Sequence, residues 1–221
     1  MNKTRDLNSY IDHTFLNASG DEDAVLKLCE EAVKYGFASV CVNPSEVPLA
    51  NAYKKNFGAE LTICTVIGFP LGQSTADVKL FEALDAIRNG AGELDFVINV
   101  RLLKYYPEAC AEELDYIIEK LNEKHPEVVT KLIIECCLLT DEEKVLACKM
   151  AKDAGFDFVK TSTGFSTGGA RVEDVRLMRK TVGLLMGVKA SGGIRTREDA
   201  EKMIAAGATR IGTSAGVKIC S

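Results

Sequence analysis

The 221-residue sequence contains no tryptophan, two histidines and five prolines. No run approaches the roughly 18 apolar residues that a membrane-spanning helix requires. The first residues, 1–6 (MNKTRD), precede no apolar segment of the kind found in a secretory signal. Lysine and arginine number 27 against 32 aspartates and glutamates, for a formal net charge of −5. These features argue against a membrane protein, a secreted protein and a general nucleic-acid binder.

The eight cysteines do not form the pattern of a zinc site or a disulfide framework. No two are spaced as Cys-x-x-Cys, and the histidines are His13 and His125. Cys64 and Cys136 lie inside apolar runs, where free cysteine packs as a small apolar side chain. We therefore expect a cytoplasmic protein with reduced thiols and without a metal or other cofactor.

Short β-rich runs alternate with amphipathic stretches along the whole chain. Helical patterns occupy residues 21–35, 45–56, 74–89, 107–123, 140–154, 172–182 and 197–206. The strand candidates are residues 10–14, 39–42, 61–67, 93–99, 131–136, 156–161, 187–190 and 209–213. Alternating βα units of this kind predict a parallel sheet covered by helices, and a count near eight favours a closed (β/α)8 TIM barrel over an open doubly wound sheet. No linker or low-complexity tract divides the chain, so we expect one domain over residues 1–221.

Several predicted strands carry charges that a dry barrel should not contain. Lys160 and Lys189 stand in similar contexts, VKTSTG and VKASGG, each before a glycine-rich turn. If the two ammonium groups lie about 5 Å apart, their repulsion of about 3 kcal/mol lowers the pKa of one lysine towards 8. A neutral lysine in a cleft is a nucleophile towards carbonyl groups. Asp95 is then expected to shuttle protons beside the pair.

The loops after the last two predicted strands contain glycine-rich stretches, residues 191–196 (SGGIRT) and 212–216 (GTSAG). In many barrels these two loops bind a phosphate group through backbone amides. Ser214 adds a hydroxyl and an amide to such a site. Residues 163–169 (TGFSTGG) form a third amide-rich loop, which we expect to close over the ligand.

The sequence resembles the deoxyribose-phosphate aldolase family of class I, Schiff-base-forming aldolases. The resemblance covers nearly the whole chain and rests on segments 11–14 (IDHT), 40–44 (VCVNP), 66–72 (VIGFPLG), 93–99 (ELDFVIN), 131–135 (KLIIE), 158–164 (FVKTSTG), 188–195 (VKASGGIR) and 210–214 (RIGTS). It implies reversible cleavage of 2-deoxy-D-ribose 5-phosphate to acetaldehyde and D-glyceraldehyde 3-phosphate without a metal. It also implies a homodimer as the assembly, since relatives commonly form one.

The resemblance assigns roles to individual residues. Lys160 matches the Schiff-base lysine, Lys189 the second lysine that lowers the pKa of its partner, and Asp95 the aspartate of the proton relay. Supporting charges match Asp12 and Lys131, and Cys41 matches a position that reacts with aldehydes in some members. The residues expected at the substrate phosphate are Gly164, Gly192, Gly193, Arg195 and Ser214.

Two departures from the family pattern change these expectations. Some members carry a phosphate-binding lysine after the KTSTG motif, where this chain has Phe165. Some also end in a terminal tyrosine that assists proton transfer, whereas this sequence stops at Cys220 and Ser221. Two alternatives remain open: a phosphate-binding barrel isomerase or synthase that uses acid–base residues alone, and a non-catalytic sugar-phosphate binder.

Overall fold

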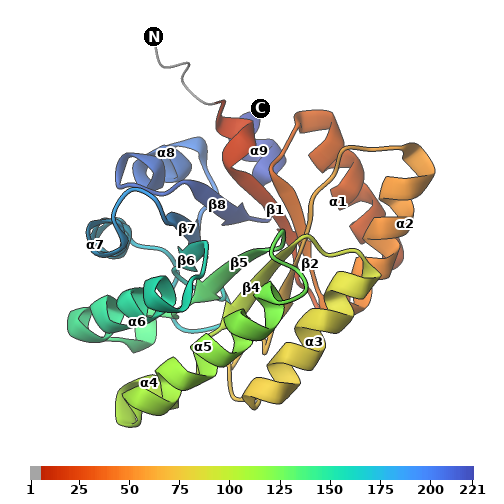
Figure 1. The fold of residues 1–221 in the computed structure, drawn as a ribbon. Helices are drawn as coiled ribbons and strands as arrows, with labels where there is room; N and C mark the ends of the chain where they lie inside the picture. Colours follow the sequence, from red (N-terminus) through yellow and green to blue (C-terminus); the bar gives the residue numbers. More distant parts are fainter. Residues whose placement is uncertain (1–5) are drawn as a thin grey trace.

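Eight parallel strands form a closed barrel in the computed structural model, which describes residues 6–221 (Figure 1). Each strand pairs with its neighbours in the sequence, and β8 closes the ring against β1. The strands are β1 (Ile11–Phe15), β2 (Ser39–Val42), β3 (Ile63–Ile67), β4 (Glu93–Val97), β5 (Val129–Ile133), β6 (Phe158–Lys160), β7 (Gly187–Ser191) and β8 (Arg210–Thr213). The predicted (β/α)8 barrel is confirmed. The prediction that no secretory signal is present rests on residues 1–6, and of these, residues 1–5 lie outside the described residues.

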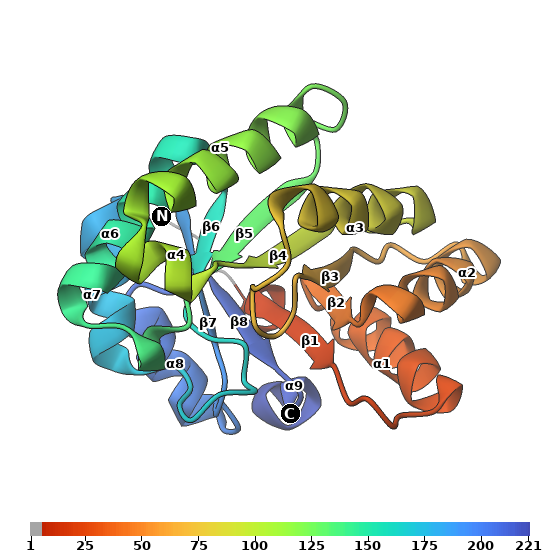
Figure 2. The same ribbon diagram turned by 90° about the horizontal axis from the view of Figure 1, so that it is seen from below.

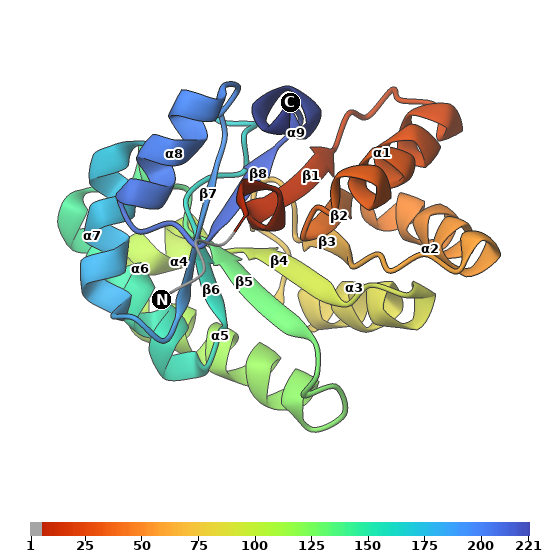
Figure 3. The same cartoon turned by 90° about the horizontal axis from the view of Figure 1, so that it is seen from above.

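Helices surround the ring of strands in chain order, as the views along the barrel show (Figures 2 and 3). All seven predicted helices are present: α1 (Glu22–Tyr35), α2 (Val47–Phe57), α3 (Ala76–Asn89), α5 (Pro107–Asn122), α6 (Asp141–Ala154), α7 (Val172–Val182) and α8 (Arg197–Ala205). The short helices that we did not predict are α4 (Val100–Tyr105), α9 (Gly216–Cys220) and the 3-10 turns η1 (Leu7–Tyr10) and η3 (Cys136–Leu138). Their one or two turns are too short to give a helical period in the sequence. A further 3-10 turn, η2 (Pro44–Glu46), overlaps the start of the helix predicted at 45–56. Within residues 6–221, no helix has the length and apolarity needed to cross a bilayer.

Helix ends follow local sequence signals. Before α6, the Glu143 amide donates to Thr140 Oγ1 (3.3 Å) and the Thr140 amide donates to Glu143 Oε2 (2.8 Å), which completes a capping box. Gly36 and Gly155 end α1 and α6 with positive φ angles of 64° and 94°. Glycine adopts this left-handed backbone without the steric cost that a Cβ atom adds, so each helix stops at its glycine.

Strand ends depart from the prediction where the apolar sequence continues past the sheet. The strand predicted at 131–136 lies at Val129–Ile133, and the one predicted at 93–99 ends at Val97. Ile98 and Ile134 follow these strands and are fully buried. Glu135, which we expected in a strand, has a left-handed backbone and precedes η3. An apolar run in the sequence predicts buried residues, and here the buried residues continue past the end of the strand.

Strand side chains alternate between two different environments. Val40, Leu94 and Val159 point towards the helices and belong to the main apolar core. Cys41, Asp95 and Lys160, which are adjacent to them in the sequence, do not belong to that core. Apolar packing between sheet and helices therefore holds the barrel together, and the interior is left for polar groups.

Candidate active site

Three lysines from three strands converge on the carboxylate of Asp95. Its Oδ2 accepts hydrogen bonds from Lys160 Nζ (2.7 Å) and Lys189 Nζ (2.8 Å), and its Oδ1 accepts one from Lys131 Nζ (2.8 Å). Strand register sets this arrangement, because Asp95 pairs with Lys131 across β4 and β5, and Lys160 pairs with Lys189 across β6 and β7. The structure thus brings together the residues that the sequence predicted as catalytic.

A second set of ion pairs lies behind this centre. Asp12 Oδ2 contacts Lys189 Nζ at 2.5 Å, and Glu93 Oε2 contacts Lys131 Nζ at 2.6 Å. Arg210 joins the two carboxylates, with its Nη1 at 2.6 Å from Asp12 Oδ1 and 2.9 Å from Glu93 Oε2. From the sequence we predicted no role for Glu93 or Arg210. Glu93 and Arg210 lie two residues before Asp95 and Gly212 in their strands. Because side chains two residues apart in a strand point to the same face, this alternation could have predicted that both point into the barrel interior.

The buried charges shift one another's titration. Burial by itself would raise the pKa of Asp95, but the ammonium groups of Lys131, Lys160 and Lys189 hold it well below its usual range. The pKa of Asp12 is lowered in the same way, against its burial, chiefly by Lys189 and Arg210. Burial would lower the pKa of Lys189 and Lys131, but adjacent carboxylates raise both. These two lysines therefore keep their protons firmly.

Lys160 carries the least compensated positive charge in the network. Lys131 and Lys189 each contact two carboxylates, whereas the ion pair recorded for Lys160 is with Asp95 Oδ2, an oxygen that Lys189 shares. The whole network has four cations and three carboxylates: Lys131, Lys160, Lys189 and Arg210 against Asp12, Glu93 and Asp95. The network therefore carries one positive charge in excess, and Lys160 is the cation with the fewest carboxylate contacts. From the sequence we expected direct repulsion between the two ammonium groups; in the structure both contact the same carboxylate oxygen, Asp95 Oδ2.

Lys160 also borders a cavity of about 630 Å³ at the carboxyl ends of the strands. Its side chain is 3% exposed, whereas those of Lys131 and Lys189 are fully buried. Every residue predicted to bind phosphate lines the same cavity: Gly164, Gly192, Gly193, Arg195 and Ser214. A ligand there would contact glycine backbone, a hydroxyl and a guanidinium as well as the side chain of Lys160.

Hydrogen bonds between neighbouring loops fix the floor of this cavity. Ser191 Oγ donates to the Ser162 carbonyl at 2.6 Å, and Thr213 Oγ1 donates to the Ile194 carbonyl at 2.7 Å. Gly192 has a φ of 88°, and a Cβ there would lie 2.9 Å from Gly169 Cα. Glycine is therefore required at this position, both for the backbone angle and for the close approach of the loop before α7.

Phe165 directly follows the KTSTG motif, at the position where the family resemblance led us to expect a phosphate-binding lysine in some members. Its ring is 57% exposed and packs edge-to-face on Phe69, with centroids 5.1 Å apart. Phe165 and Thr163 separate the catalytic cavity from a second one of about 410 Å³, which is lined by both of them and by Leu71, Tyr105 and Leu138. The mouth is thus divided into a polar lobe and a more apolar lobe.

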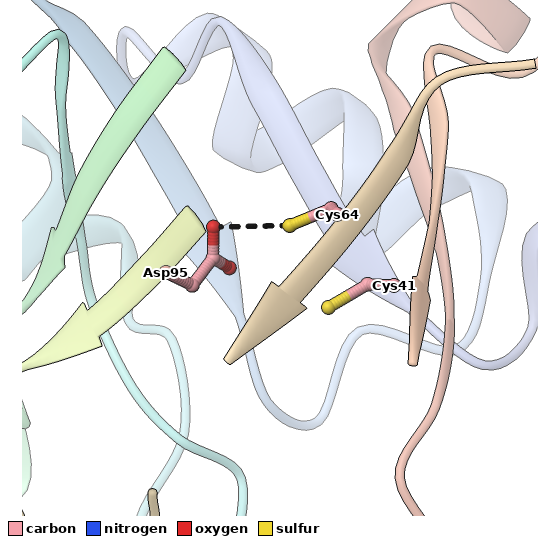
Figure 4. A group of neighbouring side chains, drawn as sticks. All are labelled: Cys41, Cys64 and Asp95. Atoms are coloured by element: carbon pink, nitrogen blue, oxygen red, sulfur yellow. Dashed lines mark hydrogen bonds between the residues drawn. The ribbon is translucent and has the colours of Figure 1, made fainter. Parts of the chain in front are cut away.

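Two buried thiols lie beside Asp95 in the barrel interior (Figure 4). Cys64 Sγ donates to Asp95 Oδ1 at 3.2 Å and accepts from Lys131 Nζ at 3.4 Å. A hydrogen bond from Cys64 lowers the pKa of Cys41, against the effect of burial. The donor atoms of Cys41, Cys64 and Asp95 lie within 4.8 Å of one another, a spacing that could suit a metal ion. The ammonium groups around Asp95 oppose a further cation there.

Comparison with known proteins agrees with this geometry. A family model described as DeoC/LacD family aldolase matches residues 7–221. The deoxyribose-phosphate aldolase of Clostridium perfringens strain 13 is 56% identical, over 95% of this chain and 92% of that protein. The deoxyribose-phosphate aldolase of Streptococcus sanguinis is 58% identical, over 96% and 94%. A solved deoxyribose phosphate aldolase from Aeropyrum pernix, described as tetrameric, is 39% identical with a TM-score of 0.89, over 97% and 89%. The match extends over nearly the entire sequence, and the chain belongs to the DeoC/LacD family of aldolases.

Proposed function

We propose that this protein catalyses the reversible cleavage of 2-deoxy-D-ribose 5-phosphate to acetaldehyde and D-glyceraldehyde 3-phosphate, through a Schiff base at Lys160. The observation that carries the proposal is the position of Lys160 between the 630 Å³ cavity and the buried charge network. The amine faces the substrate side, while the groups that control its protonation lie behind it. The names of the relatives at 56% and 58% identity support the choice of substrate.

Binding begins with the phosphate group in the glycine-rich part of the cavity. The amides of Gly164, Gly192 and Gly193 and the side chains of Ser214 and Arg195 supply the donors and the positive charge. With the phosphate fixed there, the aldehyde carbon at the other end of the open-chain sugar faces Lys160. Holding both ends of the substrate turns the first bond-forming step into a reaction between positioned groups.

The neutral amine of Lys160 attacks the C1 carbonyl, and loss of water gives a protonated Schiff base. The C3 hydroxyl then loses its proton, the C2–C3 bond breaks, and its electron pair forms an enamine conjugated to the Lys160 nitrogen. D-Glyceraldehyde 3-phosphate leaves as the first product. Protonation of the enamine carbon and hydrolysis release acetaldehyde and restore the lysine.

Asp95 moves protons in these steps, together with a water molecule or with Lys189. Its carboxylate contacts both lysines, so it lies where protons are gained and lost. The low pKa of Asp95 means that it passes a proton on instead of keeping it. In this proposal Lys189 stabilises the neutral amine by opposing the charge of Lys160, while Asp12 and Lys131 hold Lys189 and Asp95 in position.

Cys41 is proposed as a site of slow modification by aldehydes. Its thiol has a lowered pKa and therefore a larger thiolate fraction than an isolated cysteine. It is fully buried, so an attacking aldehyde must enter the barrel interior from the mouth. A Cys41→Ala variant should keep more activity than the wild type after prolonged exposure to an unsaturated aldehyde. An unchanged rate of inactivation would place the damage elsewhere.

Reductive trapping tests the central proposal. Incubation with acetaldehyde and sodium borohydride should place a two-carbon adduct on the peptide that contains Lys160, and a Lys160→Arg variant should lose it. Adducts on other lysines alone, or none, would reject the Schiff base. An isomerase or synthase that uses acid–base residues alone would give no adduct. A non-catalytic binder would also fail to release D-glyceraldehyde 3-phosphate from 2-deoxy-D-ribose 5-phosphate.

We also propose that residues 1–221 form one domain, that two copies associate as a homodimer, and that the protein works in the cytoplasm. The tetramer of the Aeropyrum pernix relative and the exposed side chains of Leu184 and Leu185 support self-association. Six of the eight cysteines are buried, which suits a reducing compartment. Sedimentation velocity, a calorimetric scan for a single unfolding transition and cell fractionation test these three statements.

A further inference from the structure

Glu135 has a backbone conformation that is unusual for any residue except glycine. Its φ is 56° and its ψ 64°, and it is the one non-glycine residue with a positive φ among residues 6–221. The amides on either side of it donate to consecutive carbonyls of the neighbouring segment, Ile134 N to Lys160 O (3.0 Å) and Cys136 N to Thr161 O (2.8 Å). This pairing requires the left-handed turn. Glycine would adopt this left-handed turn without steric cost, so the presence of glutamate indicates that its side chain has a function.

The carboxylate of Glu135 is buried; its Oε1 accepts from the thiol of Cys137 at 3.8 Å, and its shortest contacts are with Thr163 of the facing loop. Thr163 Oγ1 donates to Glu135 Oε2 at 2.5 Å, and the Thr163 amide lies 3.3 Å from the same oxygen. The hydroxyl of Thr163 in turn accepts a hydrogen bond from the Phe165 amide at 3.0 Å. A carboxylate that polarises the hydroxyl strengthens this second bond. Glu135 therefore fixes Thr163, and through it Phe165.

These two loop residues form the wall between the two cavities of the mouth. Thr163 and Phe165 line both cavities, and Gly164, with a φ of 85°, lies between them on the side of the catalytic cavity. The loop begins directly after Lys160, at the end of β6. A shift of the wall would therefore move the amide of Gly164 away from a bound phosphate, while Lys160 stays anchored in its strand.

We propose that Glu135 is a positioning residue that holds the wall of Thr163, Gly164 and Phe165 in place for the phosphorylated end of the substrate. The inference rests on the proposed aldolase function. It deepens that function, because it assigns substrate affinity to a buried carboxylate outside the lysine network. Glu135 acts through Thr163, and it is distinct from the groups that form and break bonds.

Three substitutions separate the roles of the backbone and the side chain. Glu135→Ala and Glu135→Gly should each raise the KM for 2-deoxy-D-ribose 5-phosphate about tenfold or more, with kcat within about threefold. The KM for unphosphorylated 2-deoxy-D-ribose should change little, and acetaldehyde trapping on Lys160 should persist. Glu135→Gln, which keeps one acceptor oxygen, should recover part of the affinity. Glu135→Gly should be the more thermally stable of the first two, because glycine adopts the left-handed backbone freely.

The KM of Glu135→Gly decides whether substrate affinity depends on the Glu135 side chain or only on the backbone conformation at this position. If Glu135 served the backbone alone, Glu135→Gly would match the wild type in KM, and that result would overturn the proposal. Ser166→Ala is the matched control, because Ser166 belongs to the same loop but its Oγ contacts Cys137 Sγ (3.4 Å) instead of the Glu135 carboxylate; its KM should equal that of the wild type. If the Glu135 variants fail to fold, Thr163→Val removes the same hydrogen bond. It should raise the KM for 2-deoxy-D-ribose 5-phosphate by a similar factor. An unchanged KM in Thr163→Val would reject the proposal that this hydrogen bond positions the wall. A wild type that neither traps acetaldehyde nor cleaves the sugar phosphate would instead reject the proposed function.

Discussion

Lys160 and Lys189 face each other across β6 and β7 and donate to the same oxygen atom, Oδ2 of Asp95, at 2.7 and 2.8 Å. The shared acceptor allows two ammonium groups to approach closely inside the barrel. It also means that each lysine competes with the other for one negative charge. Replacing Lys189 therefore changes the electrostatic surroundings of Lys160 even though no direct bond joins the two lysines.

Removing Lys189 should change the pH dependence of trapping. In Lys189→Met, Asp95 no longer shares its Oδ2 with a second cation, so the ammonium form of Lys160 is better stabilised. Trapping of acetaldehyde at neutral pH should slow, and its rate should reach a plateau at higher pH than in the wild type. Asp12 loses one of its two cationic partners and keeps Arg210, so stability should fall by less than the roughly 3–5 kcal/mol of a fully broken buried pair.

A matched control for that variant is Lys144→Met. Lys144 Nζ lies 2.6 Å from Asp174 Oδ1 in a buried pair outside the barrel interior. Its loss should lower stability without moving the pH profile of trapping. Identical pH profiles for Lys189→Met and the wild type would show that Lys189 does not govern the amine.

Asp95→Asn tests the proton relay. The amide cannot accept and return a proton, so kcat for cleavage should fall about 100-fold or more. Exchange of the acetaldehyde methyl protons with deuterium oxide, followed by proton NMR, isolates the enamine step from sugar binding. That exchange should slow by a similar factor. Wild-type exchange in Asp95→Asn would assign proton transfer to another group.

Gly212→Ala should displace the side chain of Lys189 by steric contact. A Cβ at position 212 would lie 3.0 Å from Ser191 Cβ and 3.1 Å from Lys189 Cε, closer than side chains normally pack. The substitution should destabilise the protein by about 1–3 kcal/mol and reduce cleavage. Gly92→Ala is the control, because a methyl group at position 92 would meet no atom within 4 Å beyond its neighbours in the chain. Equal activity of both variants would contradict tight packing at Lys189.

Ser214→Ala should affect the binding of the phosphorylated sugar more than the chemistry. The hydroxyl borders the catalytic cavity beside Gly192 and Gly193, away from the lysine network. Loss of one hydrogen bond to a charged group should raise KM about tenfold, with kcat within about threefold. Kinetics with unphosphorylated 2-deoxy-D-ribose serve as the control and should not respond. An equal rise in KM for both sugars would show that Ser214 does not bind the phosphate group.

The lowered pKa values of Asp12 and Asp95 predict a loss of stability in acid. In the unfolded chain these carboxyls take up protons below about pH 4, whereas in the folded chain they remain ionised to lower pH. The unfolded state then binds more protons, so their contribution is complete above about pH 4 and declines as pH falls towards the folded pKa. Denaturant unfolding at a series of pH values should show a shallower acid slope for Asp12→Asn. Asp153→Asn, on the exposed surface of α6, should keep the wild-type slope.

Local patterns in the sequence predicted most of the elements. The βα alternation indicated the eight strands and seven main helices, and the TSTG and SGG turns predicted where the cavity residues would gather. These predictions succeed because hydrophobic period, capping residues and glycine turns act over a few neighbouring residues. The strand end near Glu135 was wrong, since an apolar run cannot distinguish a strand from the buried segment that follows it.

The barrel, the lysine-bearing strands and the glycine-rich loops could be read from the amino-acid order, because each depends on contacts within a short segment. Three relationships became visible only in the folded chain: Asp95 lies between Lys160 and Lys189, Arg210 joins Asp12 to Glu93, and Glu135 holds Thr163. They depend on the register between strands and on which side chains meet across the closed ring. Both are set when the ring closes, by packing between residues that lie far apart in the chain.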